Sequence, residues 1–360
     1  MITYWVDQAG QFGIEDYLAD RGRLLRDRFV VRPYEWATGS LEVPAGPQVF
    51  AALDQLTASE REGVAALRQQ LAKLLPDALL LNDPRRCLLR PAMLRALAEQ
   101  GANSFRAYPA HDAPRAVRFP VFVRGANNHD GSLTQLLRSP GELRRGLAAL
   151  RLRGHRLAEL LIVEFCDTSD GQGVFRKYSA YCVGKAIVPA HLMAGRNWMM
   201  KSETAERTLA LVREDQAFIE NNPHEAWVRE VFALAGIEFG RLDYGILEGR
   251  PQAWEINLSP TLGRRPGRPR REMEPAVAEV WERSRELAHA GLREAFTGLD
   301  RRSRSAPIAL QLDRALRVRI ARAARQDRRH RAARDLLNRA YRSPLGAPLR
   351  AATRIIRAFI

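Results

Sequence analysis

Lysine and cysteine are scarce in this chain of 360 residues. Four of the 57 basic residues are lysines, so the other 53 are arginines. The three cysteines form no Cys-x-x-Cys pair, which argues against a disulfide framework or a zinc site and favours a reducing cytoplasm. No run of about 18 residues is both apolar and uncharged, and no basic segment precedes an apolar one at the N-terminus. We therefore expect neither a membrane span nor a signal peptide.

Three common catalytic motifs are also missing: Gly-x-Ser-x-Gly, His-Glu-x-x-His and Gly-x-x-x-x-Gly-Lys-Ser/Thr. Their absence argues against a serine-hydrolase elbow, a metalloprotease helix and a P-loop as the basis of function. The seven histidines show no metal-ligand spacing. His129 and His191 are candidates for contact only because they lie in or near the segments discussed below.

The chain does have enough apolar content for a large core. Hydrophobic residues make up 46% of it, and its length suits two or three domains. The formal net charge is +16, but residues 301–360 hold 17 arginines, no lysine and three aspartates, a net charge of +14. The rest of the chain is nearly neutral, so we expect no specific binding of nucleic acid.

The last residues, 349–360, would place apolar side chains on one helical face and three arginines on its flank. Such a helix suits peripheral contact with an anionic membrane or another polyanion, and it equally suits packing on its own domain. We expect a cytoplasmic protein, with peripheral attachment at the membrane surface as the alternative.

Hydrophobic patterns predict helices and strands without a long β-α-β series, which makes the fold class α+β. Helices are expected at 59–75, 91–101, 133–151, 203–235 and 274–296. Strands are expected at 77–82, 117–125 and 157–166, and hairpins at 177–192 and 239–257. Ser59 with Glu62 is the predicted start of the first helix. Arg-rich helical segments are expected beyond a linker at 303–307.

The most informative residues lie in the second hairpin. Glu255 and Asn257 are two residues apart on a strand, so their side chains point to one face, while Trp254 and Ile256 point to a core. The hairpin loop places Asp243 almost opposite Glu255. Three oxygen-bearing side chains would then converge, and such ligands suit Mg²⁺ beside phosphate oxygens.

The spacing Asp-x(11)-Glu-x-Asn, followed by Ser-Pro-Thr, resembles the metal-binding end of the ATP-grasp superfamily. Within it, the chain resembles carboxylate–amine ligases of the amino-acid-adding branch, which includes ribosomal-protein glutamate ligases. The resemblance covers roughly residues 82–262. It implies two α+β lobes that clamp ATP, with Mg²⁺ or Mn²⁺ held by Asp243, Glu255 and Asn257.

Two upstream segments extend the resemblance. Residues 80–101 resemble the segment that enters the central domain, where Arg90 stands in place of the family's phosphate-binding lysine. Residues 119–132 resemble the strand and loop that cover the triphosphate, where Arg124 replaces a second lysine. Arginine keeps the positive charge, although its geometry differs from that of lysine. The residues implied to bind ATP here are Arg90, Arg124, Gly125, Gly131 and Ser132.

Two further segments complete the implied nucleotide site. Residues 160–166 resemble the family segment that joins the lobes, which implies that Glu164 and the backbone near Phe165 contact the base and ribose. Residues 175–192 resemble the strand pair that carries cations toward the γ-phosphate, with Arg176 and Lys177 as candidates. Since neighbouring residues on a strand face opposite ways, we expect only one of them to enter the site.

Lys201, in the segment Gly-Arg-Asn-Trp-Met-Met-Lys, is a further catalytic candidate. Together with Arg196 and Asn197, it could hold the substrate or the γ-phosphate. A surface loop anchored by Trp198 is the equal alternative.

We predict an N-terminal α/β domain at 1–84, a central lobe at 85–160, a C-terminal lobe with the metal site at 161–298 and a basic helical tail at 299–360. The implied reaction is ATP-dependent formation of an amide-type bond through an acylphosphate. A small-molecule kinase on the same fold and a nucleotide-binding protein without turnover are the alternatives. The substrate would be a small molecule or a peptide, and its identity and the oligomeric state stay open.

Overall fold

The computed structural model describes most of the chain up to residue 311. The described residues are 1–8, 10–34, 40–113, 117–129, 131–263, 273–300, 306–311 and 336. They fall into two compact units: one comprises Met1–Leu88 with the described part of Thr168–Ala321, and the other comprises Leu89–Asp167. Within the described ranges, no helix is long and apolar enough to cross a lipid bilayer.

The first unit contains a parallel sheet with the strand order β2-β1-β4-β5. Its strands are β1 (Ile2–Val6), β2 (Phe29–Pro33), β4 (Gln48–Phe50) and β5 (Leu80–Leu81). They are connected by α1 (Gln11–Ala19), the short helix η1 (Arg23–Arg28) and α2 (Ala58–Leu74). All residues of β1 and β4 are buried, as parallel strands covered on both faces require. Parallel strands joined by helices are the α/β arrangement predicted for this part of the chain.

Helix α2 starts one residue before the predicted helix at 59–75, and its N-cap lies two residues before the predicted Ser59. Its N-cap is Thr57, whose Oγ1 accepts a hydrogen bond from the Glu60 amide at 3.2 Å. The Thr57 amide in turn donates to Glu60 Oε2 at 2.8 Å, which completes a capping box. The predicted start at Ser59 and Glu62 is therefore wrong. Both pairs have the same spacing, so the pattern alone does not distinguish them.

Replacing Thr57 with alanine should lower the free energy of unfolding by about 1 kcal/mol, because an amide of the first turn loses its acceptor. Ser59→Ala is the matched control, since Ser59 is exposed inside the helix, and it should change stability by less than about 0.5 kcal/mol. Urea unfolding of both variants measures the difference. Equal losses would mean that Thr57 is not the cap in solution.

The first unit also contains an antiparallel sheet with the strand order β10-β9-β11-β12. Its strands are β9 (Phe175–Val183), β10 (Ala186–Gly195), β11 (Phe239–Leu247) and β12 (Arg250–Asn257). Both predicted hairpins are confirmed by the pairing of β9 with β10 and of β11 with β12. Gly184 and Gly249 lie in the two turns with φ values of 63° and 75°, a conformation that glycine adopts without steric cost.

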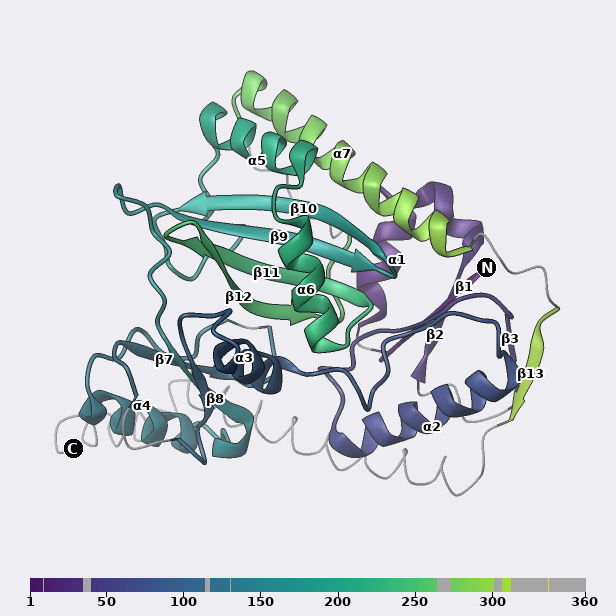
Figure 1. The fold of residues 1–360 in the computed structure, drawn as a ribbon, viewed down its shortest axis with the longest axis horizontal. Helices are drawn as coiled ribbons and strands as arrows, with labels where there is room; N and C mark the ends of the chain where they lie inside the picture. Colours follow the sequence, from purple (N-terminus) through teal and green to yellow (C-terminus); the bar gives the residue numbers. More distant parts are fainter. Residues whose placement is uncertain are drawn as a thin grey trace. The chain divides into compact units, whose positions relative to one another are not determined.

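Three helices accompany this sheet: α5 (Leu209–Asn221), α6 (Glu225–Ala235) and α7 (Pro275–Leu299). The single helix predicted at 203–235 is wrong, because α5 begins only after its N-cap Thr208 and ends at Asn221, with Asn222 as its C-cap. Asn222 has a left-handed φ of 43° and precedes Pro223, and both features stop a helix. Helices α5 and α7 lie side by side and pack against β10 (Figure 1).

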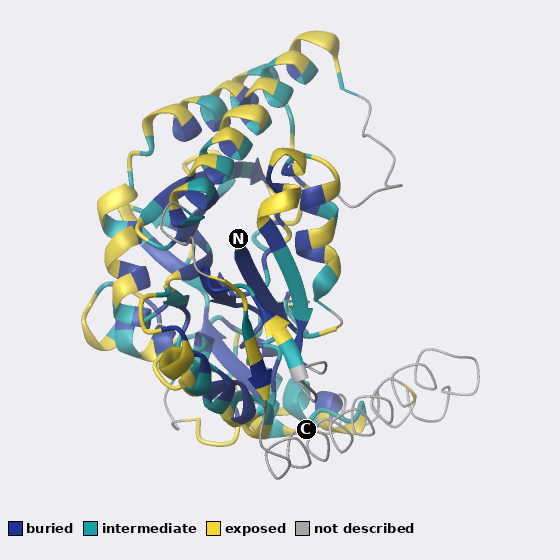
Figure 2. Ribbon diagram, turned by 90° about the vertical axis from the view of Figure 1, so that its right-hand side faces the viewer, coloured by how far each residue is buried: buried dark blue, intermediate teal, exposed yellow. Residues whose placement is uncertain are grey.

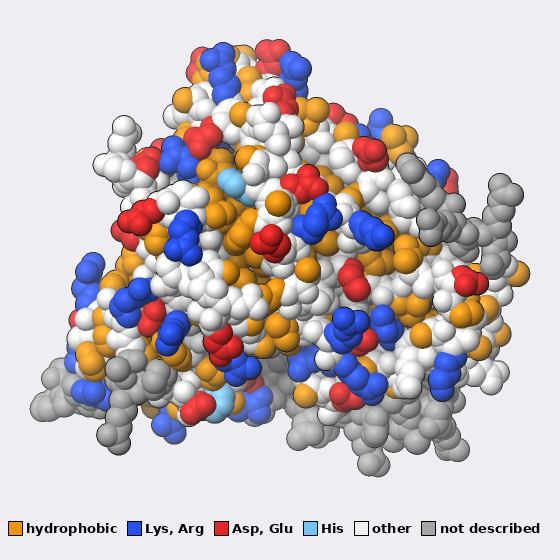
Figure 3. Space-filling view, in the orientation of Figure 1, with side chains coloured by type: hydrophobic (Ala, Val, Ile, Leu, Met, Phe, Trp, Pro, Cys, Tyr) orange, Lys and Arg blue, Asp and Glu red, His pale blue; other side chains and the backbone are white. Residues whose placement is uncertain are grey.

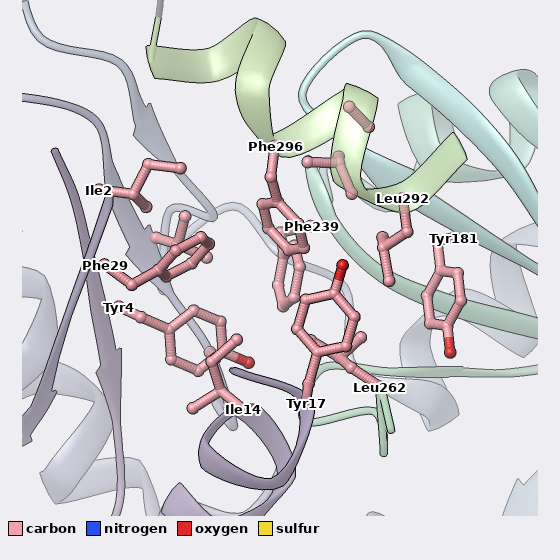
Figure 4. Packing of buried hydrophobic residues seen from close by; sticks show 14 of the residues in the cluster. Ile2, Tyr4, Ile14, Tyr17, Phe29, Tyr181, Phe239, Leu262, Leu292 and Phe296 are labelled. Atoms are coloured by element: carbon pink, nitrogen blue, oxygen red, sulfur yellow. The ribbon is translucent and has the colours of Figure 1, made fainter. Parts of the chain in front are cut away.

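One hydrophobic core joins the two sheets of the first unit (Figure 4). The ring of Tyr4 in β1 contacts that of Phe239 in β11, with centroids 5.5 Å apart. Phe29 in β2 contacts Phe296 in α7 at 5.1 Å. In Figure 2 the strands are largely buried, whereas the helices alternate between buried and exposed residues. The parallel sheet is therefore fixed on the sheet that carries the candidate site.

His289 of α7 lies beside this core, its ring 6.0 Å from that of Tyr17. Burial, together with Arg21 and Arg285, lowers its pKa from 6.5 to about 4. In the unfolded chain the histidine binds its proton near pH 6.5, whereas the folded protein binds it only near pH 4. Stability should therefore fall by up to about 3 kcal/mol as the pH is lowered from 7 to 4.

The measurement is urea unfolding across that pH range. His289→Gln should remove the contribution of His289 to the dependence of stability on pH, while His191 and His224 keep their contributions. If the free energy of unfolding of His289→Gln depends on pH as steeply as that of the wild-type protein, the assignment to His289 is contradicted.

A two-stranded antiparallel sheet pairs β3 (Ser40–Val43) with β13 (Ile308–Gln311). Residues 308–311 were expected to be helical, so that part of the tail prediction is wrong. Backbone pairing with β3 outweighs the local helical preference there. The amphipathic segment 349–360 lies outside the described residues.

The second unit contains the antiparallel sheet β6-β8-β7. Its elements are α3 (Arg90–Glu99), β6 (Ala107–Pro109), β7 (Val121–Gly125), α4 (Pro140–Leu152), the short helix η3 (Leu157–Glu159) and β8 (Leu160–Glu164). The helix predicted at 133–151 begins only at Pro140, after the N-cap Ser139. Leu133 and Leu137 instead donate backbone hydrogen bonds to β7 at 2.8 and 2.7 Å. With antiparallel sheets and helices in both units, the predicted α+β class is confirmed.

Candidate functional site

A row of polar side chains crosses all four strands of the antiparallel sheet. The register places His191 of β10 opposite Ser179 of β9, Ser179 opposite Asp243 of β11, and Asp243 opposite Glu255 of β12. Directly paired residues share a face, so these four side chains lie on the same face of the sheet. The predicted position of Asp243 opposite Glu255 is confirmed, and Asn257 lies on that face two residues beyond Glu255.

Asp243 is the most buried carboxylate in the row, with an exposed fraction of 1%. Its Oδ1 accepts hydrogen bonds from Ser179 Oγ at 2.8 Å and Arg241 Nε at 3.0 Å. Its Oδ2 lies 2.5 Å from Lys177 Nζ. Burial opposes ionisation, but Arg241 and Lys177 outweigh it and hold the pKa of Asp243 well below its usual range. Asp243 is therefore an anion at neutral pH.

The donor set fits a hard divalent cation. Glu255 is half-buried, and Asn257 is buried, with Oδ1 accepting from the Ser259 amide at 2.8 Å. A carboxylate offers about four lone-pair sites, and Asp243 has two contacts on Oδ1 and two on Oδ2, from Lys177 Nζ at 2.5 Å and from Arg241 Nη2 at 3.5 Å. A metal ion at Oδ2 would replace one of these contacts, and Glu255 supplies a second carboxylate on the same face of the sheet. In the described part of the chain, no group of three His, Cys, Asp or Glu side chains forms an all-protein metal cage.

The structure separates the two neighbouring cations on β9. Lys177 contacts Asp243, whereas Arg176 points to the opposite face. There Arg176 donates to Asp170 Oδ2 and to Glu214 Oε1, both at 2.6 Å. Of the two candidates, Lys177 is the one beside the carboxylates.

Sequence reasoning missed Arg241 and Ser179. Arg241 lies two residues before Asp243 on β11 and pairs with Asn257, so strand periodicity could have found it. Ser179 lies two residues after Lys177 on β9 and so shares its face, but a single serine in a strand does not by itself indicate a site. Its place in the row depends on the pairing of β9 with β11.

His191 is held in its neutral form. Burial, with the nearby charges of Arg241 and Arg285, keeps its pKa well below 6.5. Its Nε2 lies 3.0 Å from Ser179 Oγ.

Lys201 lies in the loop between β10 and α5, with an exposed side chain. Its backbone carbonyl accepts from the amides of Thr204 and Ala205, both at 3.0 Å, which closes a turn. Arg196 in the same loop donates to the Gln172 carbonyl at 3.0 Å. These contacts shape the loop, and a role for Lys201 in the site stays a prediction.

In the second unit, Arg90 organises the loop after β7. Its Nη1 donates to the carbonyls of Gly125 and Ala126 at 3.1 Å and of Asn128 at 2.8 Å, and Nη2 lies 3.3 Å from His129 Nδ1. Arg90 is 5% exposed. A side chain with this many carbonyl contacts sets the path of the predicted phosphate loop.

The other residues of this loop also contact residues that lie close to them in the sequence. Arg124 is buried, and its Nη2 lies 3.5 Å from the Asn128 carbonyl. Gly125 allows the loop to fold back, because a Cβ there would lie 2.4 Å from Asn128 Oδ1. Gly131 has a φ of 87°, and Ser132 Oγ donates to the Thr134 carbonyl at 2.6 Å. Binding of phosphate by these residues stays a prediction.

Glu164, at the end of β8, is buried and surrounded by donors. Its Oε1 accepts from Tyr108 Oη at 3.2 Å and from the Arg118 amide at 3.0 Å. Its Oε2 accepts from the Arg106 amide at 3.0 Å and lies 3.4 Å from the Arg118 guanidinium. The next residue, Phe165, donates its amide to the Pro120 carbonyl at 2.9 Å. Glu164 thus holds three segments together, and a ribose hydroxyl would have to replace one of these donors.

Glu164→Gln should lower the free energy of unfolding of this unit by about 2 kcal/mol, because the amide nitrogen faces donors that then lack an acceptor. Hydrogen exchange at the Arg106 and Arg118 amides should accelerate correspondingly. Glu159→Gln, which affects an exposed pair with Arg156, should change stability by less than about 0.5 kcal/mol. Unchanged exchange at both amides in Glu164→Gln would contradict the prediction.

Figure 3 shows basic and acidic side chains interspersed on the face in view. This agrees with the prediction that the body of the chain is nearly neutral outside residues 301–360.

No model of a protein family matches the sequence, and no curated protein does. Solved structures similar to the chain include ligases. A D-alanine–D-alanine ligase from Bacillus anthracis is 12% identical, with a TM-score of 0.44 over 82% of this chain and 99% of that one. An L-amino acid ligase from Bacillus licheniformis is 12% identical, with a TM-score of 0.38 over 71% of this chain and 66% of that one. The ATP-grasp ligase PsnB is 11% identical, with a TM-score of 0.42 over 82% and 97%. Identities of 11–12% and TM-scores of 0.38–0.44 are too low to assign a function, so the function is argued from this chain's own side chains.

Proposed function

We propose that this chain is an ATP-dependent ligase of the ATP-grasp type, with Asp243, Glu255 and Asn257 as ligands of Mg²⁺. The observation that carries the proposal is the register of β11 and β12, which sets Asp243 opposite Glu255 with Asn257 on the same face. Two carboxylates and an amide oxygen are hard ligands that suit Mg²⁺, which also keeps waters or phosphate oxygens. Mn²⁺ accepts the same ligands.

The charges near Asp243 favour a polyanionic substrate once a divalent cation is bound. Asp243 and Glu255 carry two negative charges, and Lys177 and Arg241 carry two positive ones. A divalent cation adds a net charge of +2, which attracts a triphosphate. Bound Mg²⁺ would neutralise charge that develops on the transferred phosphate. Lys177 and Arg241 keep Asp243 ionised, the form in which it binds a metal.

The proposed reaction joins a carboxylate to an amine. The substrate carboxylate attacks the γ-phosphate of ATP, so that ADP leaves and an acylphosphate forms. The amine then attacks the acyl carbon, phosphate leaves and an amide forms. The acceptor would be a small molecule or a peptide. The protein contributes positioning and electrostatic stabilisation, and in the second unit we assign phosphate contact to Arg124 and the loop that Arg90 shapes.

Calorimetric titration with ATP in the presence of Mg²⁺ or Mn²⁺ tests the binding step. Combined Asp243→Asn, Glu255→Gln and Asn257→Ala replacements should weaken metal-dependent binding by about 100-fold, or about 2.7 kcal/mol. Two adjacent variants provide a matched comparison: Lys177→Met should weaken binding, and Arg176→Met, on the opposite face, should not. Unchanged affinity in the triple variant would overturn the proposal.

Analysis of products tests the chemical step. ADP with an amide product supports a ligase, whereas ADP with a stable phosphoester indicates a kinase on the same fold. Tight binding without ADP release, across amino acids and peptides, would favour a nucleotide-binding protein without turnover. The contacts of Arg90 with three carbonyls motivate this last candidate, because a family lysine would bind phosphate at that position.

A further inference from the structure

We infer that His191 is a positioning residue, which acts through Ser179 to fix the orientation of the Asp243 carboxylate. The inference rests on the proposed function, since it concerns the way in which the metal ligand is held. It follows from three observations: a bulge in β10, the direction of a hydrogen-bond chain and a buried clamp on the backbone beside His191.

The bulge brings His191 to the face of the site. On β10, Val188 and Pro189 pair with Tyr181 and Ala180, but the next pair is His191 with Ser179, so Ala190 is an extra residue. Without it, residue 190 would face Ser179, and the His191 side chain would point to the opposite face.

The hydrogen-bond chain has one consistent direction. Asp243 is ionised and only accepts, so the single hydroxyl proton of Ser179 points to its Oδ1. Ser179 Oγ must then accept from His191, which places a proton on Nε2. The chain runs from His191 Nε2–H to Ser179 Oγ–H to Asp243 Oδ1. A donor at position 191 therefore keeps the serine hydroxyl directed at the carboxylate.

A buried clamp holds the backbone on both sides of His191. The Ala190 carbonyl accepts from Arg285 Nη1 at 2.8 Å, and the Leu192 amide donates to Asp215 Oδ1 at 2.6 Å. Arg285 of α7 and Asp215 of α5 are themselves joined at 2.5 Å. Two helices thus fix the bulge that presents the imidazole.

The result is a carboxylate whose two oxygens both have fixed partners in the protein. Ser179 Oγ and Arg241 Nε donate to Oδ1, whereas Oδ2 contacts Lys177 Nζ and, at 3.5 Å, Arg241 Nη2; Oδ2 faces the side on which a cation would bind. Partners that orient a metal ligand typically affect metal affinity by about 10–100-fold. Loss of the donor at 191 should therefore loosen Asp243 without removing any ligand.

The test measures Mn²⁺ affinity with ATP present, by electron paramagnetic resonance of the full chain. His191→Leu should weaken Mn²⁺ binding by about tenfold. His191→Gln, whose amide N–H replaces Nε2–H, should restore affinity to within about threefold of wild type. His289→Leu is the matched control, because it removes another half-buried imidazole of the first unit that no observed contact links to Asp243, and it should leave Mn²⁺ binding unchanged.

The outcomes distinguish this inference from the proposed function. Wild-type affinity in His191→Leu, with Asp243→Asn impaired, would overturn the positioning role alone. No Mn²⁺ binding by the wild-type chain, or binding unaffected by Asp243→Asn, would overturn the proposed function and with it the inference. Circular dichroism and unfolding of each variant establish that the compared proteins are folded, and a loss in His191→Leu that Gln does not rescue would count against the hydrogen-bond chain.

Discussion

Replacing Asp243 with alanine should lower the free energy of unfolding by about 3–5 kcal/mol, even though the residue is proposed to serve ligand binding. The carboxylate is 1% exposed and lies between Lys177 and Arg241, whose side chains are each 15% exposed. Removing it leaves two largely buried cations without their counter-charge, and the cost of desolvating them is no longer offset. Ser179 loses its acceptor as well. Urea unfolding monitored by circular dichroism measures the loss.

A second replacement tests the reason for that loss. Adding Lys177→Met to Asp243→Ala should recover part of the stability, because one uncompensated cation is removed. Lys177→Met alone should be less harmful, since Arg241 still pairs with Asp243. If the double variant is no more stable than Asp243→Ala, unpaired charge is not the cause.

Replacing Asp215 with alanine should have an effect of similar size, about 3–5 kcal/mol. Asp215 of α5 is 3% exposed and accepts from the Leu192 amide and from Arg285. Its loss leaves a buried amide and a guanidinium without their acceptor, and it releases the β10 bulge from α5. The variant should therefore also weaken Mn²⁺ binding, because His191 lies in that bulge.

Glu214→Ala is the matched control for Asp215→Ala. Glu214 is the preceding residue on α5 and pairs with Arg176 at the surface, where side chains are about one third exposed. Exposed pairs contribute about 1 kcal/mol or less, so this variant should be only slightly destabilised. A double-mutant cycle between Asp215 and Arg285 should give a coupling of about 1–3 kcal/mol. Similar losses in Glu214→Ala and Asp215→Ala would contradict the clamp.

The errors in the predicted elements share a physical cause. Thr57 with Glu60, the capping box of α2, has the same spacing as Ser59 with Glu62, so the sequence pattern does not distinguish the two pairs. The segment before α4 has a helical pattern, yet Leu133 and Leu137 bond to β7 instead. In both places, contacts made after the chain folds outweigh a weak local preference.

The sequence alone determined what depends on period and spacing. Strand alternation and a short hairpin loop are local properties, and they bring Asp243 close to Glu255 and set Asn257 on the face of Glu255; the direct pairing of Asp243 with Glu255 also needs the extra residue Trp254, a bulge in β12. Tertiary structure decided which further groups reach Asp243. Ser179, Lys177 and His191 arrive from β9 and β10, and their approach depends on strand order, on one extra residue in a bulge and on an ion pair between two helices. Such non-local pairings have no signature in the order of residues along the chain, because each local stretch is compatible with several partners and the packing of the whole sheet selects one.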